Sequence, residues 1–232
     1  MVIRRALGIG GITQAVTFVL GFVSVVVVSR LLKPEEIGVF SVAVSVLGLA
    51  HIFREFGVGQ YLVQASKVSN QQFRAAFAVA LLSSWLIAAA LFMVRMPMAQ
   101  AYGHQGIAEI LLLLSINFLI LPLGTPALAV LKRDLQFAQL AWVSILGTFV
   151  QTGVTVGAAM AGESYLSMAW GSLAMTVSKM IIVNFFRPRE TFILPAFTGI
   201  REVLQFGSIA SLASIIKEVG SAAPDLIFGR TL

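Results

Sequence analysis

Two carboxylates, Glu218 and Asp225, stand with Lys217 and Arg230 in a largely apolar stretch near the end of the chain. They are seven residues apart, so in a helix they share one face about two turns apart. A charge at the centre of a membrane helix costs about 2.5–3.5 kcal/mol, so such residues often mark paths for ions or substrates. The pattern predicts ion-coupling carboxylates in a hydrated cavity. The alternative is that Lys217 and Glu218 simply mark the end of a helix.

Basic residues at the ends of apolar runs, or inside them, form a second candidate group. Arginine binds phosphate through two parallel hydrogen bonds and lysine binds it as a point charge, so these side chains could hold an anionic head group. Snorkelling of basic side chains to the membrane interface gives the same pattern, and both interpretations stay open. Glutamines inside apolar runs could line the same cavity or bond between helices. The candidates for a substrate cavity are Arg30, Lys33, Lys179, Lys217, Arg230, Gln14 and Gln151.

Prolines and glycines inside apolar runs indicate special backbone positions. Pro122 and Pro126 lie four residues apart and predict a kink, which could be a hinge or a static bend. Pro224 predicts a further bend between the two carboxylates, because it removes a backbone hydrogen bond. Gly153 and Gly157 form a GxxxG pair, for which we expect close packing of two helices.

Sequence motifs for catalysis are missing. His51 and His104 belong to no H-E-x-x-H pattern, and there is no P-loop, no G-x-S-x-G and no cysteine. We therefore expect no catalytic residue, no cofactor and no metal site. The basic residues occur singly or in pairs and are not gathered on one face, which argues against nucleic acid as a partner.

Composition decides the class of protein. Of 232 residues, 58% are hydrophobic and 11% are charged, whereas a soluble domain carries about 25% charged residues. The apolar runs are too long for strands of a membrane barrel, which take about 9–11 residues. The sequence therefore predicts an all-α membrane protein with spans at residues 6–29, 37–53, 75–94, 110–131, 135–162 and 164–186.

The distribution of basic residues predicts the orientation. Cytoplasmic loops carry an excess of Lys and Arg. With the N-terminus inside, the inner segments hold ten basic residues, namely Arg4, Arg5, Arg54, Lys67, Arg74, Lys132, Arg133, Arg187, Arg189 and Arg201. The outer segments then hold only four, namely Arg30, Lys33, Arg95 and Arg230. We expect a multi-pass membrane protein with a cytoplasmic N-terminus.

A weak internal repeat suggests a second half. Residues 29–32 (SRLL) align with residues 229–232 (GRTL), six predicted helices later, which fits the parallel repeats of many transporters. We expect residues 1–200 to form a six-helix lobe, and residues 201–232 to form the first helix of a second, missing lobe. The chain is then a truncated form or a fragment of a longer protein.

Four segments carry a resemblance to a known family: 29–40 (SRLLKPEEIGVF), 56–64 (FGVGQYLVQ), 131–137 (LKRDLQF) and 225–232 (DLIFGRTL). They resemble loops and helix starts of bacterial polysaccharide exporters, the oligosaccharide flippases of the multidrug/oligosaccharidyl-lipid/polysaccharide superfamily. The matches run in the right order over essentially the whole chain.

The resemblance implies twelve or more helices in two lobes around a cationic cavity with alternating access. It also implies movement of a polyprenyl-pyrophosphate-linked oligosaccharide from the inner to the outer leaflet of the bacterial inner membrane, for surface polysaccharide synthesis. Its expected partners are that lipid-linked oligosaccharide, the phospholipid bilayer and polysaccharide polymerase machinery.

Two other functions remain open. One is a cation-coupled drug antiporter of the same superfamily, in which Glu218 and Asp225 would bind the ion. The basic residues favour the flippase, since a drug antiporter is expected to have an acidic or aromatic cavity. The other is a non-transporting membrane scaffold of a polysaccharide assembly complex.

Overall fold

The computed structural model describes residues 2–54, 58–64, 69–186 and 194–207. Every regular element that it describes is helical, in agreement with the predicted all-α class. The elements are α1 (Val2–Leu31), α2 (Pro34–Arg54), α3 (Val58–Gln64), α4 (Asn70–Ala101), α5 (Gly106–Ile120), a 3-10 turn η1 (Leu121–Leu123), α6 (Thr125–Arg133), α7 (Phe137–Met160) and α8 (Leu166–Phe185). A further short helix covers residues 200–207.

Five of the described helical segments are long and apolar enough to cross a membrane: Gly8–Leu31, Asn70–Ala101, Gly106–Leu123, Phe137–Met160 and Leu166–Phe185. Helix α2 covers the span predicted at 37–53. The chain is thus an all-α, multi-pass membrane protein. The total number of crossings and the division at residue 200 stay predictions, because residues 208–232 lie outside the described part.

Local sequence explains where helices α2 and α4 begin. Pro34 is the first residue of α2, where its fixed φ suits a helix and its missing N–H costs nothing. The carboxylate of Glu36 accepts a hydrogen bond from the backbone N–H of Lys33 at 2.8 Å. Ser69 and Gln72 form a capping box at the start of α4, in which each side chain accepts a backbone N–H of the other residue.

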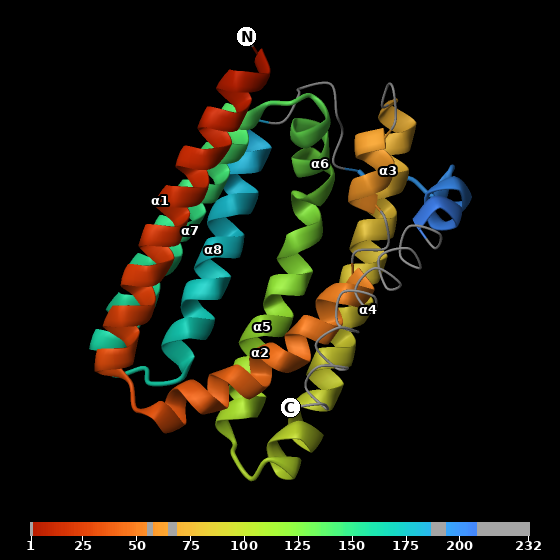
Figure 1. Cartoon of the computed structure of the whole chain (residues 1–232). Coiled ribbons are helices and arrows are strands. Elements are labelled where there is room, and N and C mark those ends of the chain that lie inside the picture. The colour runs from red at the N-terminus through yellow and green to blue at the C-terminus, as the bar shows by residue number, and fades with distance from the viewer. Residues whose placement is uncertain (1, 55–57, 65–68, 187–193, 208–232) are drawn as a thin grey trace, which may run out of the picture.

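The long helices form a row in which each packs on the next. Helix α1 packs on α7, α7 on α8, α8 on α5 and α5 on α4, while α2 crosses α5 obliquely and α3 packs on α6 (Figure 1). The α1–α2, α4–α5 and α7–α8 connections lie at one end of the bundle, which we call the α1–α2 end. The N-terminus and the α6–α7 connection lie at the opposite end.

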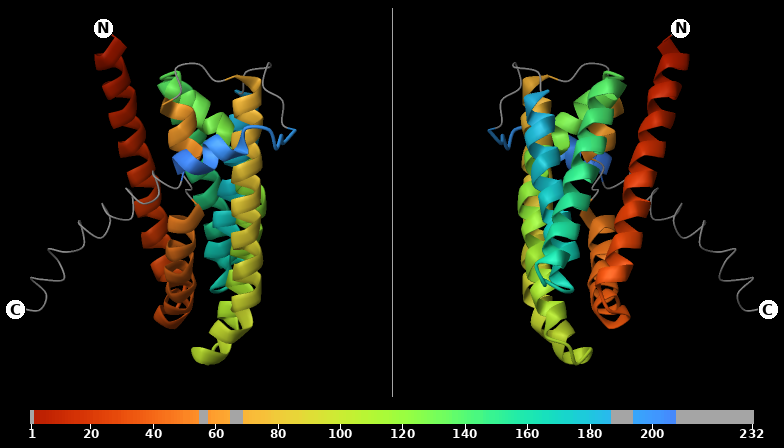
Figure 2. Two further views of the ribbon diagram at one scale, coloured as in Figure 1. Left: turned by 90° about the vertical axis from the view of Figure 1, so that its right-hand side faces the viewer. Right: turned by 90° about the vertical axis from the view of Figure 1, so that its left-hand side faces the viewer.

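Burial is uneven along this row. The largest core cluster lies between α2, α4, α5 and α8 and includes Leu47, Leu91, Leu111 and Phe118. In the most apolar 18-residue segment of α5 and η1, 56% of the residues are buried, whereas in that of α1 only 6% are buried. Helix α1 leans away from the other helices toward its N-terminal end (Figure 2). Most of its apolar surface is therefore free to face lipid or further protein.

Candidate functional site

The seam between α7 and α8 is a close helix contact that involves a charged residue. Gly147, Gln151 and Thr155 are spaced by four residues and share one face of α7. Gly171 of α8 packs against this face: a Cβ added there would overlap the Thr155 hydroxyl and lie 2.9 Å from the Gln151 carbonyl oxygen. Gly171 of α8 thus makes room for the larger Thr155 side chain of α7.

Lys179 occupies the second glycine position of the seam. A Cβ added at Gly147 would lie 2.7 Å from both Cγ and Cε of Lys179 and 3.3 Å from its Cδ. The apolar stem of the lysine therefore runs directly over the α7 backbone. The Lys179 side chain is half-buried. Among the described residues it forms no ion pair; the ion pair seen there joins Arg133 to Asp134.

The predicted span 110–131 is not one continuous helix. Helix α5 ends at Ile120, the 3-10 turn η1 follows, and α6 starts after Gly124. Pro122 lies in the turn and Pro126 in the first turn of α6, and both are buried. The break confirms the expected kink, because prolines remove backbone donors at these positions. Its use as a hinge stays a prediction.

Helix α8 holds this break in place. A Cβ added at Gly124 would overlap the Met180 sulfur and lie 2.7 Å from Cγ1 of Val183, so the backbone of the break touches α8. The Asn184 amide donates to the carbonyl oxygens of Leu123, at 3.1 Å, and of Met180, at 2.8 Å. The same helix therefore carries Lys179 and supports the break.

A buried polar pair links α5 to α8. The amide of Asn117 donates to the Ser172 hydroxyl at 3.1 Å, and Asn117 is only 4% exposed. The other end of its side chain, Oδ1, has no hydrogen-bond partner among the described residues. Sequence reasoning did not assign a role to this pair, because Ser172 gives no signal until α5 and α8 are placed together.

At the α1–α2 end, the α7–α8 connection contacts two other helices. The Ser164 hydroxyl donates to the Glu36 carboxylate of α2, and the Tyr165 hydroxyl donates to Glu109 of α5 at 2.9 Å. The hydrogen bond from Ser164 and that from the Lys33 amide hold the pKa of the Glu36 carboxyl below its ordinary value. Ser164 and Tyr165, which directly precede α8, thus connect this helix to α2 and to α5.

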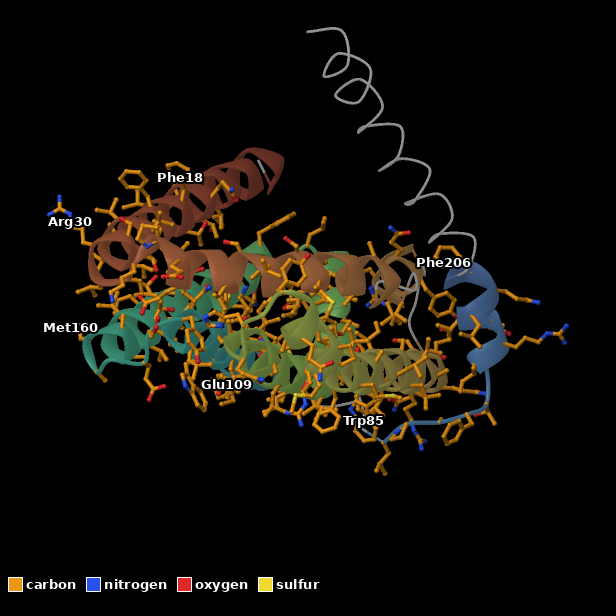
Figure 3. The ribbon with its side chains drawn as sticks, turned by 90° about the horizontal axis from the view of Figure 1, so that it is seen from below. Phe18, Arg30, Trp85, Glu109, Met160 and Phe206 are labelled. Atoms are coloured by element: carbon orange, nitrogen blue, oxygen red, sulfur yellow. The ribbon has the colours of Figure 1, made fainter. Side chains whose placement is uncertain are left out.

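The predicted cations are not gathered at one place in the described part of the chain. Arg30 and Lys33 are exposed at the α1–α2 end, and Figure 3 shows Arg30 pointing away from the helices. Lys179 lies six residues before the end of α8, nearer the opposite end of the bundle. Gln14 is exposed on α1 and Gln151 is half-buried on α7. Outside the described residues lie Lys217, Glu218, Pro224, Asp225 and Arg230.

The expectation for Gly153 and Gly157 is wrong. Both glycines are exposed on α7, and a Cβ added at either would meet no atom of the described residues within 4 Å. The close contact instead uses Gly147 and Gly171, since the rotation of α7 places a different face against α8.

Within the described ranges, no group of three His, Asp or Glu side chains lies close enough together to hold a metal ion.

Comparison with known proteins gives several relatives of about twice the length. The chain is 20% identical over 218 residues to the lipopolysaccharide biosynthesis protein WzxC of Escherichia coli (strain K12), which is 92% of this chain and 44% of that protein. It is 25% identical over 236 aligned residues to the succinoglycan biosynthesis transport protein ExoT of Rhizobium meliloti (strain 1021), 99% of this chain and 47% of the relative. The chain spans about half the length of these relatives.

A third relative is the teichuronic acid biosynthesis protein TuaB of Bacillus subtilis (strain 168), which is 20% identical over 185 residues, 78% of this chain and 38% of that protein. No solved structure matches the chain significantly. A family model described as polysaccharide biosynthesis protein matches residues 27–232, which is most of the chain. With its membrane helices and these relatives, the chain belongs to this family of polysaccharide biosynthesis proteins.

Proposed function

We propose that the chain forms the N-terminal half of a flippase that moves a polyprenyl-pyrophosphate-linked oligosaccharide across the bacterial inner membrane. The family match and a relative whose name includes transport support this proposal. On this proposal the protein is a transporter and not an enzyme, its N-terminus is cytoplasmic, and polymerase machinery takes over the exported oligosaccharide.

The position of Lys179 inside a membrane helix is the observation that carries the proposal. It is a half-buried lysine inside a membrane-spanning helix, and no described carboxylate pairs with it. A charge within the hydrocarbon region of a bilayer is costly, so it is retained where it has a task. Lysine binds phosphate as a point charge, which suits the pyrophosphate of the proposed substrate.

The other candidates would act around this cation. Lys217, Arg230, Gln14 and Gln151 would complete the cavity, and Arg30 and Lys33 would act at the α1–α2 end. Glu218 and Asp225 would bind the coupling ion. The break at Pro122 and Pro126, together with Pro224, would supply the bending that alternating access needs.

The test measures which side of the membrane holds the lipid-linked glycan. Cells deleted for the gene are complemented with its full-length product carrying Lys179→Met, Lys179→Arg or the control Lys132→Met. Methionine keeps an unbranched stem without the charge, and Lys132 is exposed at the end of α6.

We expect the deletion and Lys179→Met to leave the glycan on the cytoplasmic side, and Lys132→Met to export it normally. Lys179→Arg should restore part of the export, because it keeps the charge. Normal sidedness in the deletion strain would contradict the flippase and favour the antiporter or the scaffold. Normal export by Lys179→Met would contradict the role of the lysine.

A further inference from the structure

The side chain of Lys179 starts in a direction set by the geometry of α8. In an α-helix the Cα–Cβ bond tilts toward the N-terminus, which for α8 is the end at Leu166. The nearer end of α8, at Phe185, is six residues away, or about 9 Å. The Cα–Cβ bond of Lys179 therefore points toward the middle of the span and away from the nearer interface. To snorkel to that interface, the stem would have to turn back along α8.

The stem is fixed by α7 and not by lipid. Three successive carbons, Cγ, Cδ and Cε, lie 2.7–3.3 Å from the place where a side chain at Gly147 would begin. Gly147 is buried, so the lysine fills the space that its missing Cβ leaves. No residue other than glycine leaves room for this path, because even a methyl group would collide with the stem.

Packing alone does not require a lysine here. At the other tight position of the seam, Gly171 receives Thr155, whose side chain is short and ends at the contact. A lysine is longer, so its ammonium extends past the point where the stem crosses α7. The position of the Lys179 ammonium therefore depends on the path of the stem, and no described carboxylate forms an ion pair with it.

We propose that Gly147 is a positioning residue, which holds the stem of Lys179 across α7 and so sets where its ammonium meets the anionic group of the transported lipid. This inference rests on the proposed function. It adds a residue that contacts no substrate itself, and it makes the glycine as necessary for transport as the lysine.

The first experiment compares glycines of one helix. Full-length protein with Gly147→Ala is reconstituted in vesicles, and flipping of a fluorescent pyrophosphate-linked lipid oligosaccharide is measured. Gly153→Ala is the matched control, because this glycine lies on the same helix and the described part of the chain places no atom within 4 Å of an added Cβ. We expect Gly147→Ala to lose flipping and Gly153→Ala to retain it.

A second experiment avoids the risk that Gly147→Ala does not fold. The 232-residue sequence has no cysteine. Lys179→Cys therefore gives a single thiol, at position 179, once any cysteines elsewhere in the full-length protein are replaced. Its short side chain removes the collision. Alkylation with 2-bromoethylamine then forms a carbon–sulfur bond, releases bromide and a proton, and rebuilds a side chain of lysine length with an amine at its end.

The alkylation should restore flipping to Lys179→Cys alone and together with Gly153→Ala, but not together with Gly147→Ala. Equal restoration in all three would overturn the positioning role and leave the proposed function intact. If Lys179→Cys flips lipid normally before alkylation, the lysine itself is unnecessary and the proposed anion contact fails as well.

Discussion

Substituting Gly171 by alanine tests whether α7 and α8 pack as closely as described. The added Cβ would overlap the Thr155 hydroxyl, which can rotate, and would lie 2.9 Å from the Gln151 carbonyl oxygen, which cannot. Overpacking of a tight contact costs about 1–3 kcal/mol. Against this, alanine is the better helix former by about 1 kcal/mol. We therefore expect Gly171→Ala to lower the free energy of unfolding by about 0–2 kcal/mol.

Gly153→Ala separates the two effects. It carries the same gain in helix propensity, but its Cβ meets open space, so we expect it to be neutral or to stabilise by up to about 1 kcal/mol. The difference between the two alanine variants then isolates the collision, at about 1–3 kcal/mol. Thr155→Ala should recover part of the loss, because it removes the hydroxyl and leaves the carbonyl oxygen.

Reversible unfolding in mixed detergent micelles, followed by the helical circular dichroism signal, measures these differences. The protein, the detergent and the temperature are held constant across the variants. If Gly171→Ala and Gly153→Ala agree within about 0.5 kcal/mol, which is the scatter of ordinary surface substitutions, the described contact between α7 and α8 is wrong.

Three further results are expected. Asn117→Ala should cost about 1–3 kcal/mol by leaving its hydrogen-bond partner unpaired, whereas Asn117→Leu with Ser172→Ala should be close to neutral; the same unfolding assay distinguishes them. Gly124→Ala should destabilise by about 1–3 kcal/mol through its collision with α8, and the loss should shrink when Met180 is also changed to alanine. Ser164→Ala should raise the pKa of Glu36 toward its ordinary value, seen by NMR titration of the labelled carboxyl. Because that pKa is lowered in the folded protein, its stabilising effect is present above the unfolded pKa and is lost as pH falls through the folded pKa; an unchanged pKa in Ser164→Ala would contradict the contact.

The sequence by itself determined the class of protein and the main local features. With 11% charged residues the chain cannot cover a soluble surface, and its long apolar runs predict helices because a membrane requires every backbone group to be paired internally. The break after Ile120 follows from Pro122, and the start of α2 follows from Pro34, since proline acts on its own backbone. These features depend on composition or on neighbouring residues, which are visible in the sequence.

Only the tertiary structure decided which residues meet between helices. Gly153 and Gly157 have the spacing of a packing motif, yet the contact uses Gly147 and Gly171. Likewise, the sequence places Lys179 inside an apolar run, but only the placement of α7 shows that its stem crosses the backbone at Gly147. The physical reason is that the rotation and the register of two helices arise from the fit of both surfaces. The pattern of one helix specifies its own faces but not the face that its neighbour will contact.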